Sequence, residues 1–279
     1  MKKILVPVDF SKQSKAAFNM ALKIATKTKG QVTLLHVLYL PVLDSGFVGE
    51  PLAYDSVFLD QMEKDARREL EKMKNDSASS IKINIELVFG NVIASIKANI
   101  EKYNSDLVIL GSSGVSGIPS LIIGSVTEKV VRHATIPVLV VNDKFALDNV
   151  SNIVLPSTLD LNQKDFMAEV KKLQEFFGAT LHILLINTPH RFMRDADANE
   201  AFAEFIEHYS LRNYKTYFRN YKNEEEGILD FAAREKMNLI AMSTHARKGL
   251  SHLFNGSITE DVVNKMTLPI WTYCLKSVG

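Results

Sequence analysis

The chain has 279 residues, 46% of them hydrophobic and 23% charged, a composition typical of a globular protein with room for two domains. Residues 1–144 carry a net charge of +3 and the remainder −2, so neither half has the basic excess of a nucleic-acid-binding protein. Cys274 is the only cysteine, which excludes an intramolecular disulfide and favours a reducing compartment. No stretch suits a signal peptide or a membrane span, so we expect a cytoplasmic protein with neither membrane nor nucleic-acid partner.

In the first half, apolar runs predict buried strands, and apolar residues at helical spacing predict helices between them. The segment Leu38–Tyr54 contains prolines and glycines and predicts a loop. The expected elements are strand Lys3–Pro7, helix Ser11–Lys27, strand Val32–Val37, helix Asp55–Asn75, strand Ile81–Val88, helix Val92–Tyr103, strand Leu107–Leu110, helix Ser125–His133 and strand Val138–Val141.

The second half predicts the same alternation after a short polar stretch, Asp143–Asn149. Its expected elements are strand Ile153–Leu155, helix Lys164–Phe177, strand Thr180–Ile186, helix Ala198–Tyr209, strand Tyr214–Tyr221, helix Glu226–Lys236, strand Leu239–Met242, helix Ser257–Lys265 and strand Pro269–Tyr273. Strands separated by helices pair in parallel through right-handed crossovers, which predicts two doubly wound α/β domains. Ligands of such domains bind beyond the carboxyl ends of the strands.

A glycine pattern lies between the last two strands expected in the first half. It consists of Gly111, two residues, Gly114, nine residues, and Gly124-Ser125. Glycine permits a positive φ and a close backbone approach, and a helix N-terminus offers converging N–H donors to a phosphate. The loop contains no Lys or Arg, unlike a Walker A loop, so a phosphate would depend on amides, hydroxyls or a metal. Spacing alone leaves a second interpretation open, in which the glycines only form a turn and a helix start.

The same frame occurs again 132 residues later in an altered form. It reads Ser243-Thr-His-Ala246, nine residues, and Gly256-Ser257, so the chain is a duplication. Serine and alanine replace the first two glycines, and their Cβ atoms fill space that a phosphate would need. Thr158 also stands where the first half has Asp9. We therefore expect the second half not to bind a nucleotide as the first half does.

Several segments together resemble the universal stress protein family over nearly the whole chain. Besides the glycine pattern, they are Lys3-Ile-Leu-Val-Pro-Val-Asp9-Phe-Ser11, Leu34-Leu-His36-Val37, Asp106-Leu-Val-Ile-Leu-Gly111, Gly124-Ser-Val-Thr-Glu-Lys-Val-Val-Arg132 and Ile136-Pro-Val-Leu-Val-Val141. The resemblance implies two flavodoxin-like (Rossmann-like) domains, residues 1–145 and 149–279, with five-stranded parallel sheets of order 3-2-1-4-5. It also implies that the domains pack through their last strands as an intramolecular pseudo-dimer.

The resemblance further implies an ATP site in the first domain, with or without Mg²⁺. The implied adenosine contacts are Pro7, Val8, Asp9 and Val37. The implied ribose and phosphate contacts are Gly111, Ser112, Gly114, Gly124, Ser125 and Val126. Many relatives have a basic residue in this loop, and its absence here weakens the case for tight triphosphate binding.

The sequence leaves three candidate functions. The first is an ATP-binding stress-response or regulatory module, with no catalytic residue and at most slow hydrolysis. The second is a nucleotide-free scaffold that acts through dimer-like association, with a second copy or a partner protein. The third is an adenine-nucleotide α-hydrolase, which would need an S-G-G-x-D-S loop where this chain has Val8-Asp-Phe-Ser11. The first is the function that the sequence favours.

Individual residues outside the glycine pattern suggest no second chemistry. His36 ends a buried strand and is expected to be a satisfied core or rim histidine. His245 and His252 are a weak pattern for a metal, and we expect no metal site. Cys274 lies in an apolar strand and is expected to be a packing thiol.

Overall fold

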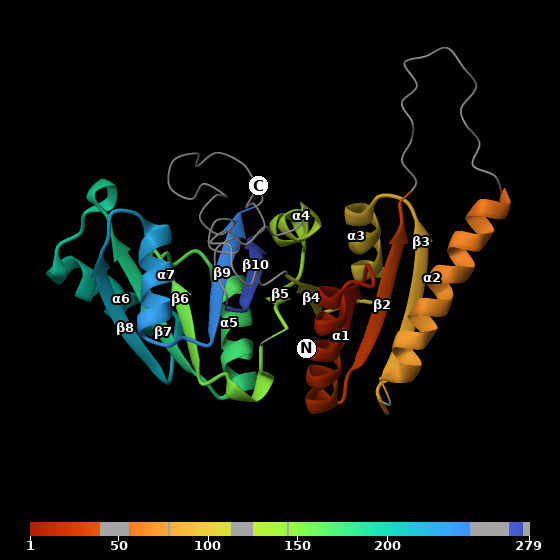
Figure 1. Cartoon of the computed structure of the whole chain (residues 1–279). Coiled ribbons are helices and arrows are strands. Elements are labelled where there is room, and N and C mark those ends of the chain that lie inside the picture. The colour runs from red at the N-terminus through yellow and green to blue at the C-terminus, as the bar shows by residue number, and fades with distance from the viewer. Residues whose placement is uncertain (40–55, 78, 113–124, 144, 246–267, 276–279) are drawn as a thin grey trace, which may run out of the picture. The chain divides into compact units, whose positions relative to one another are not determined.

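The computed structural model describes residues 1–39, 56–77, 79–112, 125–143, 145–245 and 268–275 (Figure 1). The chain forms two compact units, Met1–Leu110 and Gly111–Gly279. The unit boundary precedes the glycine pattern, so the end of the first repeat belongs to the second unit. Most of the predicted loop Leu38–Tyr54 and the predicted helix Ser257–Lys265 lie outside the described residues.

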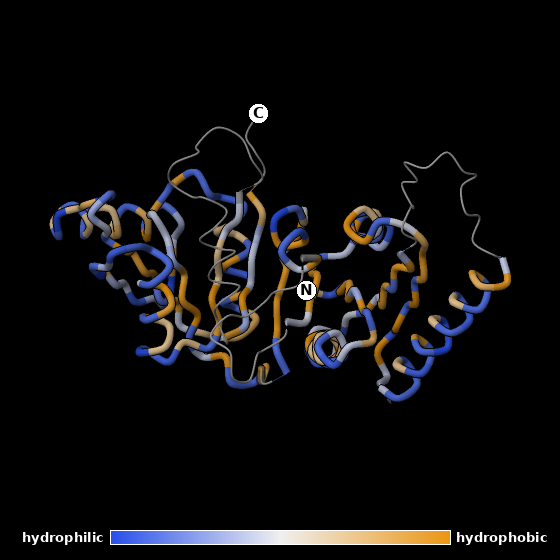
Figure 2. The backbone as a smooth tube through the Cα atoms, turned by 45° about the horizontal axis from the view of Figure 1, so that its top comes forward, coloured by the Kyte–Doolittle hydropathy of each residue, from blue (hydrophilic) through white to orange (hydrophobic). Residues whose placement is uncertain are grey.

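The first unit is a parallel sheet with helices on both faces. Its elements are β1 (Lys3–Pro7), α1 (Lys12–Thr28), β2 (Gln31–Leu38), α2 (Ser56–Asp76), β3 (Lys82–Phe89), α3 (Val92–Lys102) and β4 (Leu107–Gly111), whose last residue starts the second unit. The strands lie in the order β3-β2-β1-β4. Helices α1 and α2 cover one face of this sheet and α3 covers the other (Figures 1 and 2).

The second unit contains the end of the first repeat and all of the second. Its elements are α4 (Ser125–His133), β5 (Val138–Val141), β6 (Asn152–Pro156), α5 (Lys164–Phe177), β7 (Thr180–Asn187), α6 (Asp195–Tyr209), β8 (Tyr214–Asn220), α7 (Glu224–Arg234), β9 (Leu239–His245) and β10 (Ile270–Leu275), with 3₁₀ turns at Leu147–Asn149 and Pro189–Arg191.

The strands of the second unit form the order β5-β10-β9-β6-β7-β8. Counted from β6, the second repeat therefore has the order 3-2-1-4-5, with all of its own pairs parallel. Strand β5 pairs antiparallel with β10, so the last strands of the two repeats meet. The order across the unit boundary and the pseudo-dimer packing of whole domains stay predictions.

Continuous apolar strands form the core, as their sequences predict. Every residue from Leu107 to Leu110 is buried, and much of the hydrophobic colour in Figure 2 lies on strands. Helix α2 is the opposite case, since only Ala66, Leu70 and Met73 are buried and most of its length is hydrophilic (Figure 2). This fits the solvated helix that its charged sequence predicts. None of the described helices is long and apolar enough to cross a membrane.

Two helices begin earlier than the apolar pattern predicts. Helix α6 begins at Asp195, three residues before Ala198, and α7 begins at Glu224, two residues before Glu226. Acidic residues in the first turn are favoured by the helix dipole, which apolar periodicity does not detect. In α7, the side chain of Asn223 also caps the helix by accepting from the backbone N–H of Glu226 at 2.8 Å.

Candidate functional site

In the first unit, a tight turn follows β1 at the carboxyl edge of the sheet. The backbone N–H of Val8 donates to the carbonyl of Leu35 at 2.8 Å, which extends the β1–β2 pairing by one residue. Phe10 then adopts a φ of +65°, in the left-handed region, and reverses the chain toward α1. Three of the predicted adenosine contacts, Pro7, Val8 and Asp9, lie in this turn.

The carboxylate of Asp9 is held by the start of α1. It accepts from the backbone N–H of Ser11 at 3.1 Å, while Ser11 caps the helix by accepting from the N–H of Ser14 at 3.2 Å. Partial burial would raise the pKa of Asp9, but hydrogen bonds from Ser11 and Ser14 outweigh burial and lower it below the usual value. Asp9 is exposed, so the ionised carboxylate both supports the turn and faces solvent.

His36 is tied to the same turn from β2. Its Nδ1 lies 2.7 Å from the carbonyl oxygen of Val8, and because a carbonyl only accepts, Nδ1 carries the proton. The imidazole also contacts the ring of Phe10, with the two ring centroids 4.4 Å apart and the ring planes tilted by 32°. The prediction of a satisfied rim histidine is confirmed. Val37, the fourth predicted adenosine contact, is the next residue of β2 and is half-buried.

The glycine pattern begins at the end of a strand and ends at the beginning of a helix. Gly111 is the last residue of β4 and has an extended backbone, so this position does not require a positive φ. What glycine offers a ligand here is the absence of a Cβ. The N–H of Ser112 donates to the carbonyl of Val141 at 2.8 Å. Helix α4 begins at Ser125, and Val126 is 37% exposed. The other two predicted contacts, Gly114 and Gly124, lie outside the described residues.

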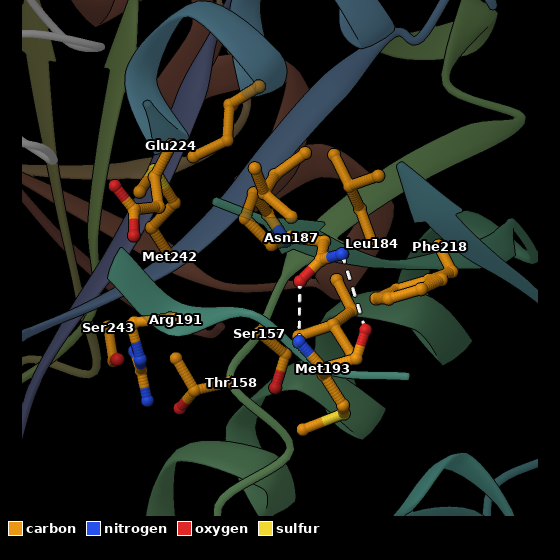
Figure 3. A pocket seen from close by; sticks show the side chains of 14 residues that line it. Ser157, Thr158, Leu184, Asn187, Arg191, Met193, Phe218, Glu224, Met242 and Ser243 are labelled. Carbon is orange, nitrogen blue, oxygen red and sulfur yellow. Dashed lines mark hydrogen bonds between the residues drawn. The ribbon is translucent and has the colours of Figure 1, made fainter. Parts of the chain in front are cut away.

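A pocket of about 90 Å³ lies at the carboxyl ends of β6, β7 and β9, in the second repeat (Figure 3). Its lining combines an apolar floor with charged and hydroxyl side chains. The lining residues are Pro156, Ser157, Thr158, Leu184, Leu185, Ile186, Asn187, Arg191, Met193, Phe218, Glu224, Ile228, Met242 and Ser243. The altered glycine pattern did not predict this pocket.

The pocket occupies the position in the second repeat that the predicted nucleotide site occupies in the first. Pro156, Ser157 and Thr158 correspond in sequence to Pro7, Val8 and Asp9, and further lining residues correspond to Val37 and Gly111 (Ile186 and Ser243). The turn after β6 also has the same backbone as the turn after β1. The N–H of Ser157 donates to the carbonyl of Leu184 at 2.9 Å, and Leu159 has a φ of +60°.

Asn187, the last residue of β7, fixes one wall of the pocket. Its Oδ1 accepts from the N–H of Met193 at 2.8 Å, and its Nδ2 donates to the carbonyl of Met193 at 3.3 Å (dashed in Figure 3). Nδ2 also donates to Oδ1 of Asn220 at 2.8 Å. Asn187 is buried, so these bonds satisfy an amide that would otherwise be costly inside the protein. They fasten the segment that carries Arg191.

The opposite wall is the beginning of α7. Glu224 is the first residue of this helix, where the helix dipole favours a carboxylate. Its Oε1 accepts from the hydroxyl of Thr188 at 3.5 Å. Gly227, one turn further on, permits close packing on β7, since a Cβ there would lie 2.7 Å from Cδ1 of Ile186. The sequence indicates neither wall, because each depends on tertiary contacts that apolar periodicity does not reveal.

The floor of the pocket belongs to the hydrophobic core between β6, β7, β9 and α7. Four lining residues, Leu184, Ile186, Ile228 and Met242, are members of the buried core cluster, and the last three retain small exposed fractions. A floor of aliphatic and thioether side chains provides an apolar surface next to the polar rim.

Metal ligation and thiol chemistry receive no support from the described part of the chain. No group of three or more potential ligands occurs there. His245 ends β9, and His252 lies outside the described residues. Cys274 is buried and its Sγ donates to the carbonyl of Arg132 at 3.3 Å, as a packing thiol does.

The sequence model of the universal stress protein family matches the chain twice, over residues 1–142 and 152–273. The chain belongs to the universal stress protein family. It is 32% identical over 142 residues to a universal stress protein of Methanocaldococcus jannaschii, a match that covers 50% of this chain and 81% of the relative. Each repeat is thus one domain of the family, in tandem.

Solved structures with the same tandem architecture share the fold. A universal stress protein from Archaeoglobus fulgidus superimposes with a TM-score of 0.76 and 18% identity, covering 98% of both chains. A functionally unknown protein from Pseudomonas aeruginosa superimposes with a TM-score of 0.67 and 17% identity, covering 98% of this chain and 92% of the other. At these identities the likeness concerns the α/β fold alone.

Proposed function

We propose that this universal stress protein binds ATP in its first domain, residues 1–145, and acts as a stress-response or regulatory module in the cytoplasm. The observation that carries the proposal is the intact glycine pattern, which starts at the end of β4 and leads into the N-terminus of α4. An N-terminus entered through glycines presents unpaired N–H donors and the positive end of the helix dipole to a phosphate.

The turn after β1 supplies the other half of the proposed site. The adenosine contacts proposed are Pro7, Val8, Asp9 and Val37, and the phosphate and ribose contacts are Gly111, Ser112, Gly114, Gly124, Ser125 and Val126. The ionised carboxylate of Asp9 can accept from a ribose hydroxyl or the adenine amine. Phosphate charge is met by amides, hydroxyls and Mg²⁺, because the loop has no Lys or Arg.

Regulation by binding fits these residues better than turnover. Asp9 belongs to the adenosine side of the proposed site, and no catalytic base is assigned beside the phosphates. Hydrolysis would therefore be slow at most, and ATP would act by shifting a conformational or partner equilibrium. The partner in that equilibrium is a second copy of the chain or another protein.

A second candidate function is a nucleotide-free scaffold that works through dimer-like association. The antiparallel pairing of β5 with β10 favours it, because this pairing joins the last strands of the two repeats. In this function the domains 1–145 and 149–279 would form an internal pseudo-dimer, and the glycine loop would be only a turn.

Calorimetric titration of the full chain with ATP, with and without Mg²⁺, tests the proposal. Gly114→Val should abolish binding, because a branched side chain would fill the space in which a phosphate approaches the backbone. The matched control is Ala246→Val at the corresponding position of the second repeat, which should leave binding unchanged. ATP binding that survives Gly114→Val would contradict the proposed site, and no binding by the unaltered chain would favour the scaffold. Rapid phosphate release would instead indicate an enzyme.

A further inference from the structure

The pocket of the second repeat lies where doubly wound domains bind ligands. It opens at the carboxyl ends of β6, β7 and β9, and β6 and β9 are the neighbours between which the strand order reverses. The lining residues that the structure describes all belong to one compact unit. These described residues, from Pro156 to Ser243, are all part of the second repeat.

The pocket has a charged end and an apolar end. Figure 3 shows Arg191, Thr158, Ser243 and Glu224 toward one end, and Phe218 toward the other. Among the described lining residues, the cation is Arg191 and the anion is Glu224. The remaining polar groups at this end are hydroxyls, which can donate or accept. Such a lining suits a ligand with both signs of charge at one end and an apolar group at the other.

Both charged residues are held in place by the fold. The hydrogen bonds of Asn187 to Met193 fasten the segment that carries Arg191, and Glu224 is fixed as the first residue of α7. A guanidinium has five N–H donors, so Arg191 can bind a carboxylate while it keeps contacts within the protein. Glu224 likewise has acceptor positions beyond the one that faces Thr188.

We propose that this pocket binds a small zwitterion with an apolar side chain, the chemistry of a hydrophobic α-amino acid. The carboxylate of the ligand would pair with Arg191 and the ammonium group with Glu224, while the side chain would point toward Phe218 at the other end of the pocket (Figure 3). A ligand with a carboxylate alone would leave Glu224 beside a like charge. A polyphosphate fits worse still, since Glu224 would repel it and Thr158 and Ser243 add no positive charge.

Binding of L-leucine to the full chain tests the charge requirement. Isocaproate lacks the ammonium group of leucine and isoamylamine lacks its carboxylate, while all three carry the same branched chain. Leucine should bind saturably in calorimetric titration. Both analogues should bind with an affinity at least about tenfold lower, because each loses a charge-assisted hydrogen bond. No saturable leucine binding, or equal binding of all three compounds, would overturn the proposal.

Two variants test which charged residue binds which group of the ligand. In Arg191→Gln the advantage of leucine over isoamylamine should disappear, and in Glu224→Gln the advantage over isocaproate should disappear. The matched controls are Arg212→Gln and Glu207→Gln, which do not line the pocket and should leave leucine binding unchanged. Fluorescence of Trp271, the only tryptophan, checks that each variant keeps the second repeat folded.

Competition separates this site from the proposed nucleotide site. In the Gly114→Val background, ATP should not displace leucine. Displacement there would show that the pocket is a nucleotide site. Leucine binding that is unchanged in both Arg191→Gln and Glu224→Gln would place the ligand elsewhere and also overturn the proposal.

Discussion

The turn after β1 and the turn after β6 have closely similar backbones and different side chains. Phe10 and Leu159 have φ values of +65° and +60°, and the residue after each strand's proline bonds the neighbouring strand in the same way. The polar residue just before this left-handed residue has changed, because Thr158 in the second repeat stands where Asp9 stands in the first. Duplication has therefore preserved the geometry of a strand-end site while its charge diverged, which is why the two repeats are expected to bind different ligands.

The turn between the first helix and the second strand of each repeat has the glycine at a different position in the two repeats. In the first repeat Lys29 takes the left-handed conformation, with a φ of +51°, and Gly30 follows. In the second repeat Gly178 takes it, with a φ of +65°, and Ala179 follows. The glycine has moved by one position, so each repeat meets a different steric demand at the same corner.

The largest effect expected from this comparison is that of Gly30→Ala. A Cβ on Gly30 would lie 2.3 Å from the carbonyl oxygen of Lys2. That oxygen already accepts a hydrogen bond from the N–H of Gln31 at 2.6 Å. Backbone atoms cannot move aside cheaply, so we expect a loss of about 2–3 kcal/mol in the free energy of unfolding. The corresponding bond in the second repeat, from Thr180 to Ser151, is longer, at 2.9 Å, and a methyl group is tolerated there.

Urea unfolding checks this prediction with two signals. Circular dichroism reports both repeats, whereas fluorescence of Trp271 reports the second repeat. Gly30→Ala should lower the midpoint in circular dichroism and leave the Trp271 transition in place. The matched variant Ala179→Gly should lower the free energy of unfolding of the second repeat, measured from the Trp271 transition, by only about 1 kcal/mol. A Gly30→Ala protein as stable as the original would show that the two strands can separate freely at this point.

A smaller effect is expected from the left-handed residues themselves. Lys29→Gly should stabilise the first repeat by about 1 kcal/mol, since glycine adopts a positive φ without the steric penalty of a Cβ. Gly178→Lys should destabilise the second repeat by a similar amount. Lys29→Ala is the control for the lost charge and should give no gain. Equal midpoints for Lys29→Gly and Lys29→Ala in urea would contradict the conformational explanation.

The fold was predictable from the sequence because its signals are local. Continuous apolar runs predicted the strands, as at Leu107–Leu110, and apolar residues at helical spacing predicted α1. Helix starts were missed where charge rather than apolar spacing determines them, as at Asp195. Strand pairing between β5 and β10 was implied only by the family resemblance, since no local pattern indicates which edges meet.

The candidate sites were predictable only in part. The ends of the glycine pattern lie at a strand end and a helix start, as its spacing indicates. The pocket of the second repeat was missed, because the loss of glycines suggested a lost site. Its walls depend on Asn187 reaching Met193 and on Gly227 packing against β7, contacts between segments that no linear pattern identifies.

The smallest effect expected concerns a buried position at which the repeats differ, His182 in the second and Thr33 in the first. Nε2 of His182 donates to Oδ1 of Asn152 at 2.9 Å, and Nδ1 lies 3.1 Å from the hydroxyl oxygen of Tyr217, which can donate to a neutral imidazole. Burial, helped by the charge of Lys215, lowers the pKa of His182 below its usual value.

Acidification should therefore destabilise the second repeat. Below about pH 6.5 the unfolded chain binds a proton at His182 that the folded chain binds only at lower pH, so stability falls until the folded pKa is passed. His182→Thr should reduce the loss of stability between about pH 7.5 and pH 5, measured by urea unfolding with Trp271 fluorescence. The control His190→Gln, at an exposed histidine, should retain the full loss. If both variants keep it, the pH dependence arises elsewhere in the chain and the buried imidazole is not its source.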